Sequence, residues 1–282
     1  MRYRYNEVNL HTHSYYCRHG KGEIVDYVNV AKAKGLLKVL GFSEHAPLPD
    51  RTLDYGTRMA YSELDDYERD VKRADGRGGI KVLLGAECDW IEDEAGYYRD
   101  ELLGERGYSY LLGSVHSMVS PVTGLDTYIS RIGIAFRPML PEYVRKYTKM
   151  LSSGLFLYGC HPDLYMADYR LWDENAKAAA KDIGECAKDC GVPLEMNDNG
   201  LRKCLIDTEE GKRHPYTNKE FWLMMKDIGV KIAMGSDAHM PQDVQGNETE
   251  GFPSATIKLS QDIGIKLVDW EIEGNQIRVA DE

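Results

Sequence analysis

The positions of the histidines constrain this chain more than any other feature. Seven of its eight histidines lie at or just after the end of a short apolar run of strand length, and His214 is the exception. The seven are His11, His13, His19, His45, His116, His161 and His239. Because His11 and His13 are two positions apart, in a strand both side chains point to the same face and can reach one point in space. This geometry suits a metal ion, although an isolated pair of this kind can also be an exposed strand end without a role.

Apolar runs of strand length recur along the chain, and each is followed by an ionisable or amide side chain. There are seven such runs, which end near residues 10, 42, 85, 113, 159, 194 and 235. Helical periodicity marks segments between them, at 24–34, 62–74, 141–151 and 174–190, and after a Thr217-x-x-Glu220 capping box. Alternating strands and helices predict a parallel sheet with crossover helices. The tail over residues 266–279 predicts one or two edge strands.

The strand ends bring the histidines together if the sheet is a barrel. In a parallel barrel, the C-terminal ends of all strands share one face, where enzymes of this architecture place their sites. Glu87 and Asp237 also follow strand ends, which makes nine candidate ligands on one rim. One such histidine alone is more often structural than a ligand, because histidine is intermediate in burial. Nine imidazole and carboxylate ligands are too many for one ion and suit Zn, Mn or Fe, so we expect two or three divalent transition-metal ions.

Length and composition fit one soluble domain. A chain of 282 residues can form one barrel of alternating strands and helices, and no Pro- or Ser-rich linker divides it, so we expect a single domain over residues 1–282. No apolar run approaches the ~20 residues that span a bilayer, and no apolar signal segment follows the N-terminus. These features predict a cytoplasmic protein. The six cysteines form no Cys-x-x-Cys pair and are expected to be free thiols.

The charge of the chain restricts its partners. A formal net charge of −11 argues against nucleic acid and membrane surfaces as partners and favours a small phosphorylated substrate drawn in by local positive charge. A guanidinium presents a planar fork of donors that matches phosphate oxygens. Arg202 follows a strand end, beside Lys203, and is the strongest candidate, whereas Arg58 is a weaker one. Either arginine could instead be a surface residue on a loop.

Eight short motifs resemble the PHP (polymerase and histidinol phosphatase) superfamily, and most of all its histidinol-phosphate phosphatase branch. They are His11-Thr12-His13, Cys17-Arg18-His19, GFSEHAP (41–47), LGAE (84–87), GSVH (113–116), HPDL (161–164), EMNDNGLRK (195–203) and GSDAH (235–239). The motifs occur in family order and cover nearly the whole chain up to about residue 245. Two positions depart from the family pattern. Asn9 stands where the family usually has Asp, and Ser117-Met118 follows His116 where the phosphatases often carry an aromatic residue.

The resemblance implies a distorted seven-stranded (β/α)7 barrel with three metal ions at the C-terminal ends of the strands. It places one ion on His11, His13, Glu87 and Asp237, a second on Glu87, His116 and His161, and a third on His19, His45 and His239. The residues expected to act in catalysis are Asp237, His239 and Arg202. Those expected to bind the substrate are Arg202, Lys203 and Arg58.

The activity implied by the resemblance is metal-dependent hydrolysis of L-histidinol phosphate in histidine biosynthesis. Water between two cations is acidified toward a pKa of about 7, and the cations neutralise the phosphoryl group, so no protein nucleophile is required. Two alternatives remain: the same chemistry on another small phosphomonoester or a phosphodiester, and a metal-binding module without activity. The complete ligand set argues against the inactive module, whereas no sequence feature encodes recognition of an imidazole.

Overall fold

A computed structural model of the chain describes residues 1–49, 56–120, 123–129, 131–246, 248 and 253–281. Its centre is a sheet of seven parallel strands, β2 (Val8–Asn9), β3 (Val39–His45), β4 (Lys81–Asp89), β5 (Tyr110–Ser114), β8 (Tyr158–Gly159), β9 (Leu194–Asn197) and β12 (Ile232–Gly235). Their order across the sheet is β12-β9-β8-β5-β4-β3-β2. Each strand therefore lies beside the one before it in the series, as short crossover connections require.

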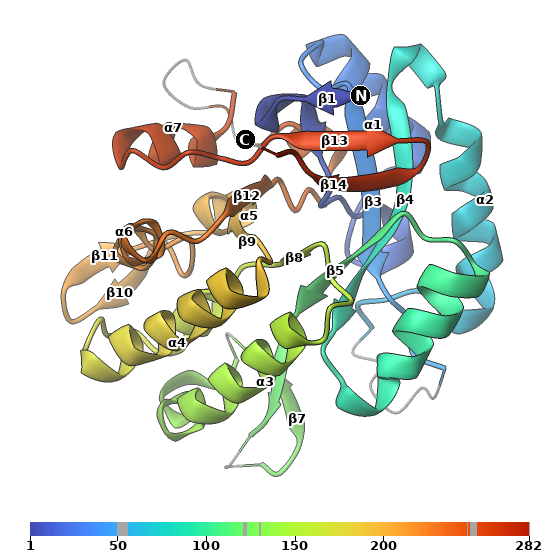
Figure 1. The fold of residues 1–282 in the computed structure, drawn as a ribbon. Coiled ribbons are helices and arrows are strands. Elements are labelled where there is room, and N and C mark those ends of the chain that lie inside the picture. Colours follow the sequence, from blue (N-terminus) through green and yellow to red (C-terminus); the bar gives the residue numbers. More distant parts are fainter. Residues whose placement is uncertain (50–55, 121–122, 130, 247, 249–252, 282) are drawn as a thin grey trace.

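The two edges of this sheet meet beyond the ends of β2 and β12. Thr12 forms a parallel bridge with Ala238, and the His13 N–H donates to the Ala238 carbonyl at 2.8 Å. Figure 1 shows the strands at the centre of the molecule, with the helices around them. The sheet is thus a nearly closed barrel, which confirms the predicted distorted seven-stranded α/β fold.

Five helices lie at the predicted positions on the outside of the barrel. They are α1 (Ile24–Lys34), α2 (Leu64–Ala74), α3 (Leu140–Ser152), α4 (Glu174–Cys190) and α6 (Lys219–Ile228). Local chemistry sets their ends: the Asp173 carboxylate accepts two backbone N–H groups at the start of α4, and Gly191 ends that helix at a φ of 70°. None of the helices in the described part of the chain has both the length and the apolar character needed to span a bilayer.

The start of α6 corrects one prediction. Asn218, not Thr217, is the N-cap, and its side chain accepts the N–H groups of Glu220 and Phe221. The Thr217 hydroxyl instead donates to the Asn197 carbonyl at 2.5 Å. The predicted capping box is therefore wrong, because a contact with β9 takes the hydroxyl away from the helix.

Several elements were not predicted. They are the π-helix η7 (Tyr97–Glu105), the helices α5 (Asp198–Arg202) and α7 (Ala255–Asp262), the hairpin of β6 (Ser117–Val119) with β7 (Asp126–Tyr128), and the hairpin of β10 (Ile206–Thr208) with β11 (Gly211–Arg213). All six cysteines are free, as predicted.

The tail forms strands, as predicted, but not at an edge of the barrel sheet. β13 (Trp270–Glu273) and β14 (Gln276–Val279) pair with β1 (Arg2–Tyr3) in a separate antiparallel sheet. Trp270, Ile272 and Ile277 pack into the same apolar cluster as Val8 and Val39 at the start of β2 and β3. This small sheet therefore closes the barrel at the end opposite the predicted ligands (Figure 1).

Candidate metal centre

All nine predicted ligands lie at the end of the barrel where the parallel strands terminate. His11 and His13 follow β2, His19 lies in the next loop, His45 ends β3, Glu87 lies near the end of β4, His116 follows β5, His161 follows β8, and Asp237 and His239 follow β12. The barrel topology thus brings together residues that are up to 228 positions apart in the chain, from His11 to His239.

Glu87 lies in the middle of the centre and is only 1% exposed. Its Oε1 faces His116 and His161, and its Oε2 faces His11, His13 and His45, at separations of 3.0–3.4 Å. The shortest are 3.0 Å to His161 Nε2 and 3.0 Å to His45 Nδ1. Because the two oxygens face different sets of imidazoles, this carboxylate can bridge two cations.

Asp237 presents one oxygen to the imidazoles. Its Oδ1 lies 3.4 Å from His13 Nε2 and 3.7 Å from His11 Nε2. Its Oδ2 instead accepts the side-chain amides of Asn197 and Asn199, at 3.2 and 3.0 Å. The two amides fix the carboxylate so that Oδ1 is the atom that faces the centre.

In several of the histidines, one ring nitrogen lies within hydrogen-bonding distance of a protein oxygen atom. The pairs are His11 Nδ1 with Glu195 Oε1 at 2.7 Å, His116 Nδ1 with Asp89 Oδ1 at 2.8 Å, and His19 Nδ1 with the Cys17 carbonyl at 2.7 Å. A neutral imidazole that donates from Nδ1 keeps a lone pair on Nε2, where a cation can bind. These contacts therefore select the tautomer that a metal ligand needs.

Glu195 and Asp89 were not predicted as site residues. Asp89 lies two positions after Glu87 in β4, so strand alternation could have identified it. Glu195 directly follows the apolar run that ends near residue 194, so the strand-end pattern marks it. That pattern does not identify its partner, His11, which is 184 residues away. The position of Glu195 also requires Gly235, since a Cβ there would overlap Glu195 Oε1.

Asn9 ties the first strand end to the last. Its Oδ1 accepts the backbone N–H groups of His11 and Ser236, at 3.2 and 3.1 Å. Its Nδ2 donates to Thr12 Oγ1, Ser236 Oγ and the Val244 carbonyl, at 2.9, 2.7 and 2.8 Å. The two hydroxyls could donate to a carboxylate, but the Val244 carbonyl can only accept, so the amide found here in place of the family's Asp is suited to its surroundings.

Ring nitrogens without a protein partner mark where cations fit. In the described part of the chain, Nε2 of His11, His13 and His239 is buried and has no hydrogen-bond partner. Potential ligand atoms lie within 4.8 Å of one another in the groups His11-His13-Asp237, His13-His45-Glu87 and His19-His45-His239. An unpaired buried polar atom is costly, and a bound cation would remove that cost.

The charge states of most of these groups also suit metal ions. Burial lowers the pKa of His19 and of His239, and it lowers the pKa of His45 to about 3. Burial alone would raise the pKa of Glu87 and of Asp237, but the nearby imidazoles lower both pKa values well below the usual range. Burial alone would also lower the pKa of His11 and of His116, but neighbouring carboxylates raise the first well above its usual value and the second to about 10. Neutral imidazoles and ionised carboxylates are the forms that bind Zn, Mn or Fe, so these two imidazoles would release a proton when a cation binds, and the other groups already have the form that fits such ions.

A pocket of about 940 Å³ opens above the centre. Tyr128 stacks on His116 with ring centroids 5.3 Å apart, and Tyr216 meets His161 edge-on at 6.2 Å. Tyr128, from the β6–β7 hairpin, thus supplies an aromatic face that Ser117-Met118 cannot. Lys203 also lines this pocket, and its predicted contact with the substrate stays a prediction.

Arg202 lines the pocket and is also held by the protein. Its Nη1 donates to Asp198 Oδ2 at 2.8 Å, and its Nη2 donates to the carbonyls of Ser236 and Asp237 at 2.8 and 2.9 Å. A guanidinium has five N–H donors, so these contacts do not exhaust it. The predicted contact between Arg202 and phosphate stays a prediction.

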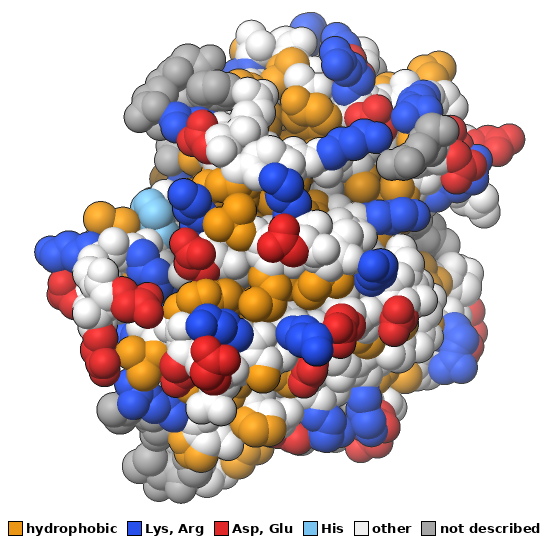
Figure 2. Space-filling view, turned by 60° about the vertical axis from the view of Figure 1, so that its left-hand side comes forward, with side chains coloured by type: hydrophobic (Ala, Val, Ile, Leu, Met, Phe, Trp, Pro, Cys, Tyr) orange, Lys and Arg blue, Asp and Glu red, His pale blue; other side chains and the backbone are white. Residues whose placement is uncertain are grey.

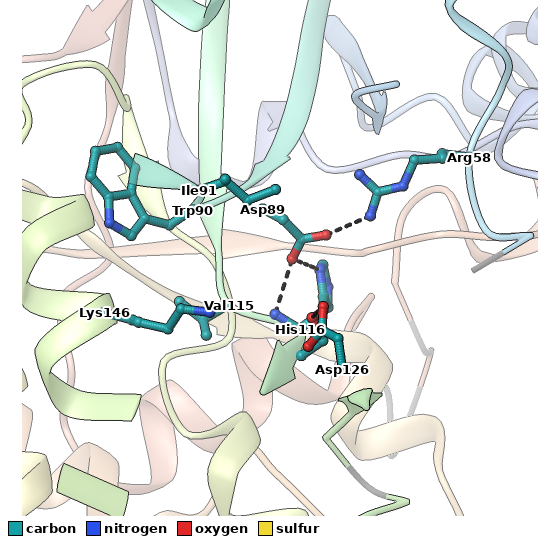
Figure 3. A pocket seen from close by; sticks show the side chains of 9 residues that line it. Arg58, Asp89, Trp90, Ile91, Val115, His116, Asp126 and Lys146 are labelled. Carbon is teal, nitrogen blue, oxygen red and sulfur yellow. Dashed lines mark hydrogen bonds and ion pairs between the residues drawn. The ribbon is translucent and has the colours of Figure 1, made fainter. Parts of the chain in front are cut away.

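Arg58 lies beside Asp89 and does not line the large pocket. Figure 3 shows its guanidinium pointing toward Asp89, at 2.7 Å, and Asp89 in turn faces His116. The described residues that line the large pocket include Thr57 but not Arg58. The predicted contact between Arg58 and the substrate therefore has no support from this geometry, and it stays a prediction.

Comparison with known proteins identifies similar chains. Residues 9–199 match the family described as the PHP domain. The chain is 26% identical over 271 residues to the histidinol-phosphatase of Bacillus subtilis, and the alignment covers 86% of this chain and 96% of that protein. It is 22% identical over 270 residues to the Schizosaccharomyces pombe protein named "probable histidinol-phosphatase", and this alignment covers 84% of this chain and 82% of that protein.

Among solved structures, a similar one is the histidinol phosphate phosphatase of Lactococcus lactis, complexed with Zn, L-histidinol and phosphate. The TM-score is 0.69 at 15% identity, over 96% of this chain and 98% of that chain. At this identity the similarity establishes a shared fold.

Proposed function

Since the PHP domain match spans residues 9–199, the chain belongs to the PHP family, and we propose that it hydrolyses L-histidinol phosphate to L-histidinol and phosphate. The observation that carries this proposal is the convergence of seven imidazoles and the Asp237 carboxylate around Glu87 at the base of a large pocket. The names of the similar proteins from Bacillus subtilis and Lactococcus lactis support the choice of substrate.

We assign the ligands in three sets. One ion would bind His11, His13, Glu87 and Asp237, a second Glu87, His116 and His161, and a third His19, His45 and His239. When bound, such ions acidify water to a pKa near neutrality and neutralise the charge of a phosphoryl group. The Zn in the Lactococcus lactis structure supports a divalent transition metal here.

The chain's own residues orient the reacting groups. Asp237 and His239 line the large pocket, as do the predicted ligands His19, His45, Glu87, His116 and His161. We propose that Asp237 and His239 also act in catalysis. Arg202 would donate to phosphate oxygens from N–H groups that its protein contacts do not use. The volume of about 940 Å³ lies in the range of pockets that hold an organic ligand, so a phosphomonoester with a sizeable leaving group can enter.

The alternatives have less support. An inactive module does not require a full set of ligands, yet all nine are present and converge. A nucleic-acid phosphodiester would favour a basic surface, whereas the face seen in Figure 2 carries acidic and basic side chains interspersed. Another small phosphomonoester remains the main competitor, because the metal centre acts on the phosphoryl group alone.

The test is phosphate release by purified enzyme saturated with Zn, Mn or Fe. The panel contains L-histidinol phosphate, phosphoserine, a sugar phosphate, p-nitrophenyl phosphate and the diester bis-p-nitrophenyl phosphate. We expect kcat/KM for L-histidinol phosphate to exceed every other value by a factor of about 100 or more, equivalent to roughly 2.7 kcal/mol of transition-state binding. A higher kcat/KM for another member of the panel would identify that compound as the better substrate. No phosphate release from any member would instead support the metal-binding module without activity.

A further inference from the structure

The guanidinium of Arg58 is buried and makes no contact with the large pocket. The residue is 6% exposed. Its Nη2 donates to Asp89 Oδ2 at 2.7 Å, and its Nη1 donates to the Ala46 carbonyl at 3.0 Å. Figure 3 shows Arg58 and His116 on two sides of the Asp89 carboxylate, beside a small pocket of about 40 Å³.

Asp89 uses its other oxygen to hold His116 in two ways. Its Oδ1 accepts the His116 backbone N–H at 3.0 Å and lies 2.8 Å from the His116 ring Nδ1. The ring is therefore fixed both in position and in orientation, and its Nε2 lies 3.3 Å from Glu87 Oε1. A change in Asp89 would move a predicted metal ligand directly.

Arg58 also connects two strand ends that carry predicted ligands. Ala46 directly follows His45, the last residue of β3, and Asp89 is the last residue of β4, two positions after Glu87. A planar guanidinium can donate to both acceptors at once, whereas the ammonium of lysine is a point charge without this fork. The side chain thus spans the ends of β3 and β4 and reaches the end of β5 through Asp89.

We propose that Arg58 is a positioning residue of the metal centre, which holds the Asp89 carboxylate so that His116 presents Nε2 toward Glu87. This role replaces the contact with the substrate that the sequence suggested for Arg58. It rests on the metal centre of the proposed function but not on the identity of the substrate. Partners of this kind typically change metal affinity or activity by about 10- to 100-fold when they are removed.

The test uses Arg58→Met, Arg58→Lys and Asp89→Asn, with Arg145→Met as the matched control, because Arg145 pairs with a carboxylate, that of Glu142, on the exposed surface. Binding of Zn is titrated in metal-free protein without substrate, and the absorption spectrum of the Co²⁺ form reports the ligand geometry. For Arg58→Met we expect about 10- to 100-fold weaker binding of one equivalent, an altered Co²⁺ spectrum, a lower kcat, and a KM within about twofold of wild type at saturating metal.

Arg58 and Asp89 should also behave as one unit in metal binding. The double variant Arg58→Met/Asp89→Asn should bind metal no more weakly than Asp89→Asn alone, because contacting residues are not additive. Arg58→Lys should fall between wild type and Arg58→Met. Arg145→Met should match wild type in all readouts.

Several outcomes would overturn the proposal. Wild-type metal affinity with a raised KM in Arg58→Met would make Arg58 a substrate ligand, and wild-type metal affinity with only reduced stability would make it a structural residue. If Arg58→Met does not fold by circular dichroism, Arg58→Lys decides: weaker metal binding in the folded variant supports the proposal, and wild-type affinity refutes it. Because metal binding is measured without substrate, a wrong choice of substrate would not affect this result.

Discussion

Glu87 is the side chain that joins the two sides of the metal centre, because its oxygens face different imidazoles. Glu87→Gln removes the negative charge and one of the two acceptor oxygens while it keeps the size of the side chain. We expect a loss of most bound metal and activity near background, with the barrel still folded. Elemental analysis, phosphate release and circular dichroism measure the three quantities.

The control for this substitution is Glu92→Gln, since Glu92 is exposed and its carboxylate pairs with Lys149 on the surface. It should retain metal and activity, because substitutions at exposed positions usually have small effects. Substantial phosphatase activity in Glu87→Gln would show that this residue does not bridge ions.

Arg202 combines two roles that substitution can separate. Arg202→Ala should leave metal content unchanged and lower kcat/KM for L-histidinol phosphate by about 2–5 kcal/mol, the cost of removing one partner of a buried charge pair. It should also lower stability, because Asp198 is buried and loses its charged partner. Kinetics are therefore measured well below the melting temperature, together with metal analysis. Arg202→Lys should recover only part of the loss.

The control is Arg213→Lys. Arg213 also donates to backbone carbonyls, those of Met166, His214 and Pro215, but it is not among the described residues of the large pocket. It should lose stability without a change in KM. If Arg202→Lys behaves in the same way, Arg202 has no contact with the substrate.

At the level of secondary-structure elements, the small sheet of β1, β13 and β14 closes one end of the barrel. Trp270 is 1% exposed, lies within the inner apolar cluster, and has its ring centroid 6.1 Å from that of Tyr158. Trp270→Ala should destabilise the protein by about 3–5 kcal/mol, the usual cost of emptying a buried aromatic site. Denaturant unfolding measures this loss.

Leu205→Ala is the control, because Leu205 is 52% exposed and should change stability by no more than about 0.5 kcal/mol. An effect of Trp270→Ala as small as that of the control would mean that β13 and β14 cover the barrel without stabilising it.

The predicted ligands of the metal centre come from six of the seven strand ends of the barrel, so bound ions should act on the whole molecule. We expect more than one transition-metal ion per chain, and removal by a chelator should lower the melting temperature, because the ligands converge only in the folded state. An ion at 100 times its Kd contributes about 2.7 kcal/mol. Calorimetry should show one transition if residues 1–282 form a single domain, which stays a prediction.

Elemental analysis provides the check on this expectation. One equivalent of metal or less in protein prepared without chelators would contradict it, as would a melting temperature that does not change on chelation. Restoration of the melting temperature by added metal serves as the control for damage by the chelator.

The sequence by itself determined the order of the seven barrel strands and of the five helices outside them, and which residues gather at one end of the barrel. Apolar periodicity and helix ends such as Asp173 and Gly191 depend on neighbours in the chain, so they can be identified without the fold. The ends of parallel strands must share one face. The convergence of Glu87, Asp237 and the histidines therefore followed from local patterns, although their roles as ligands stay predictions.

Only the tertiary structure decided which side chains hold these groups. Glu195 reaches His11 across 184 positions, and Arg58 reaches Asp89 across 31. Neither pair repeats with the period of a strand or helix, because each forms only when the folded sheet brings separate strand ends together. The same reason explains Thr217, whose hydroxyl binds a strand instead of capping its helix, and the tail, which covers the barrel instead of extending its sheet.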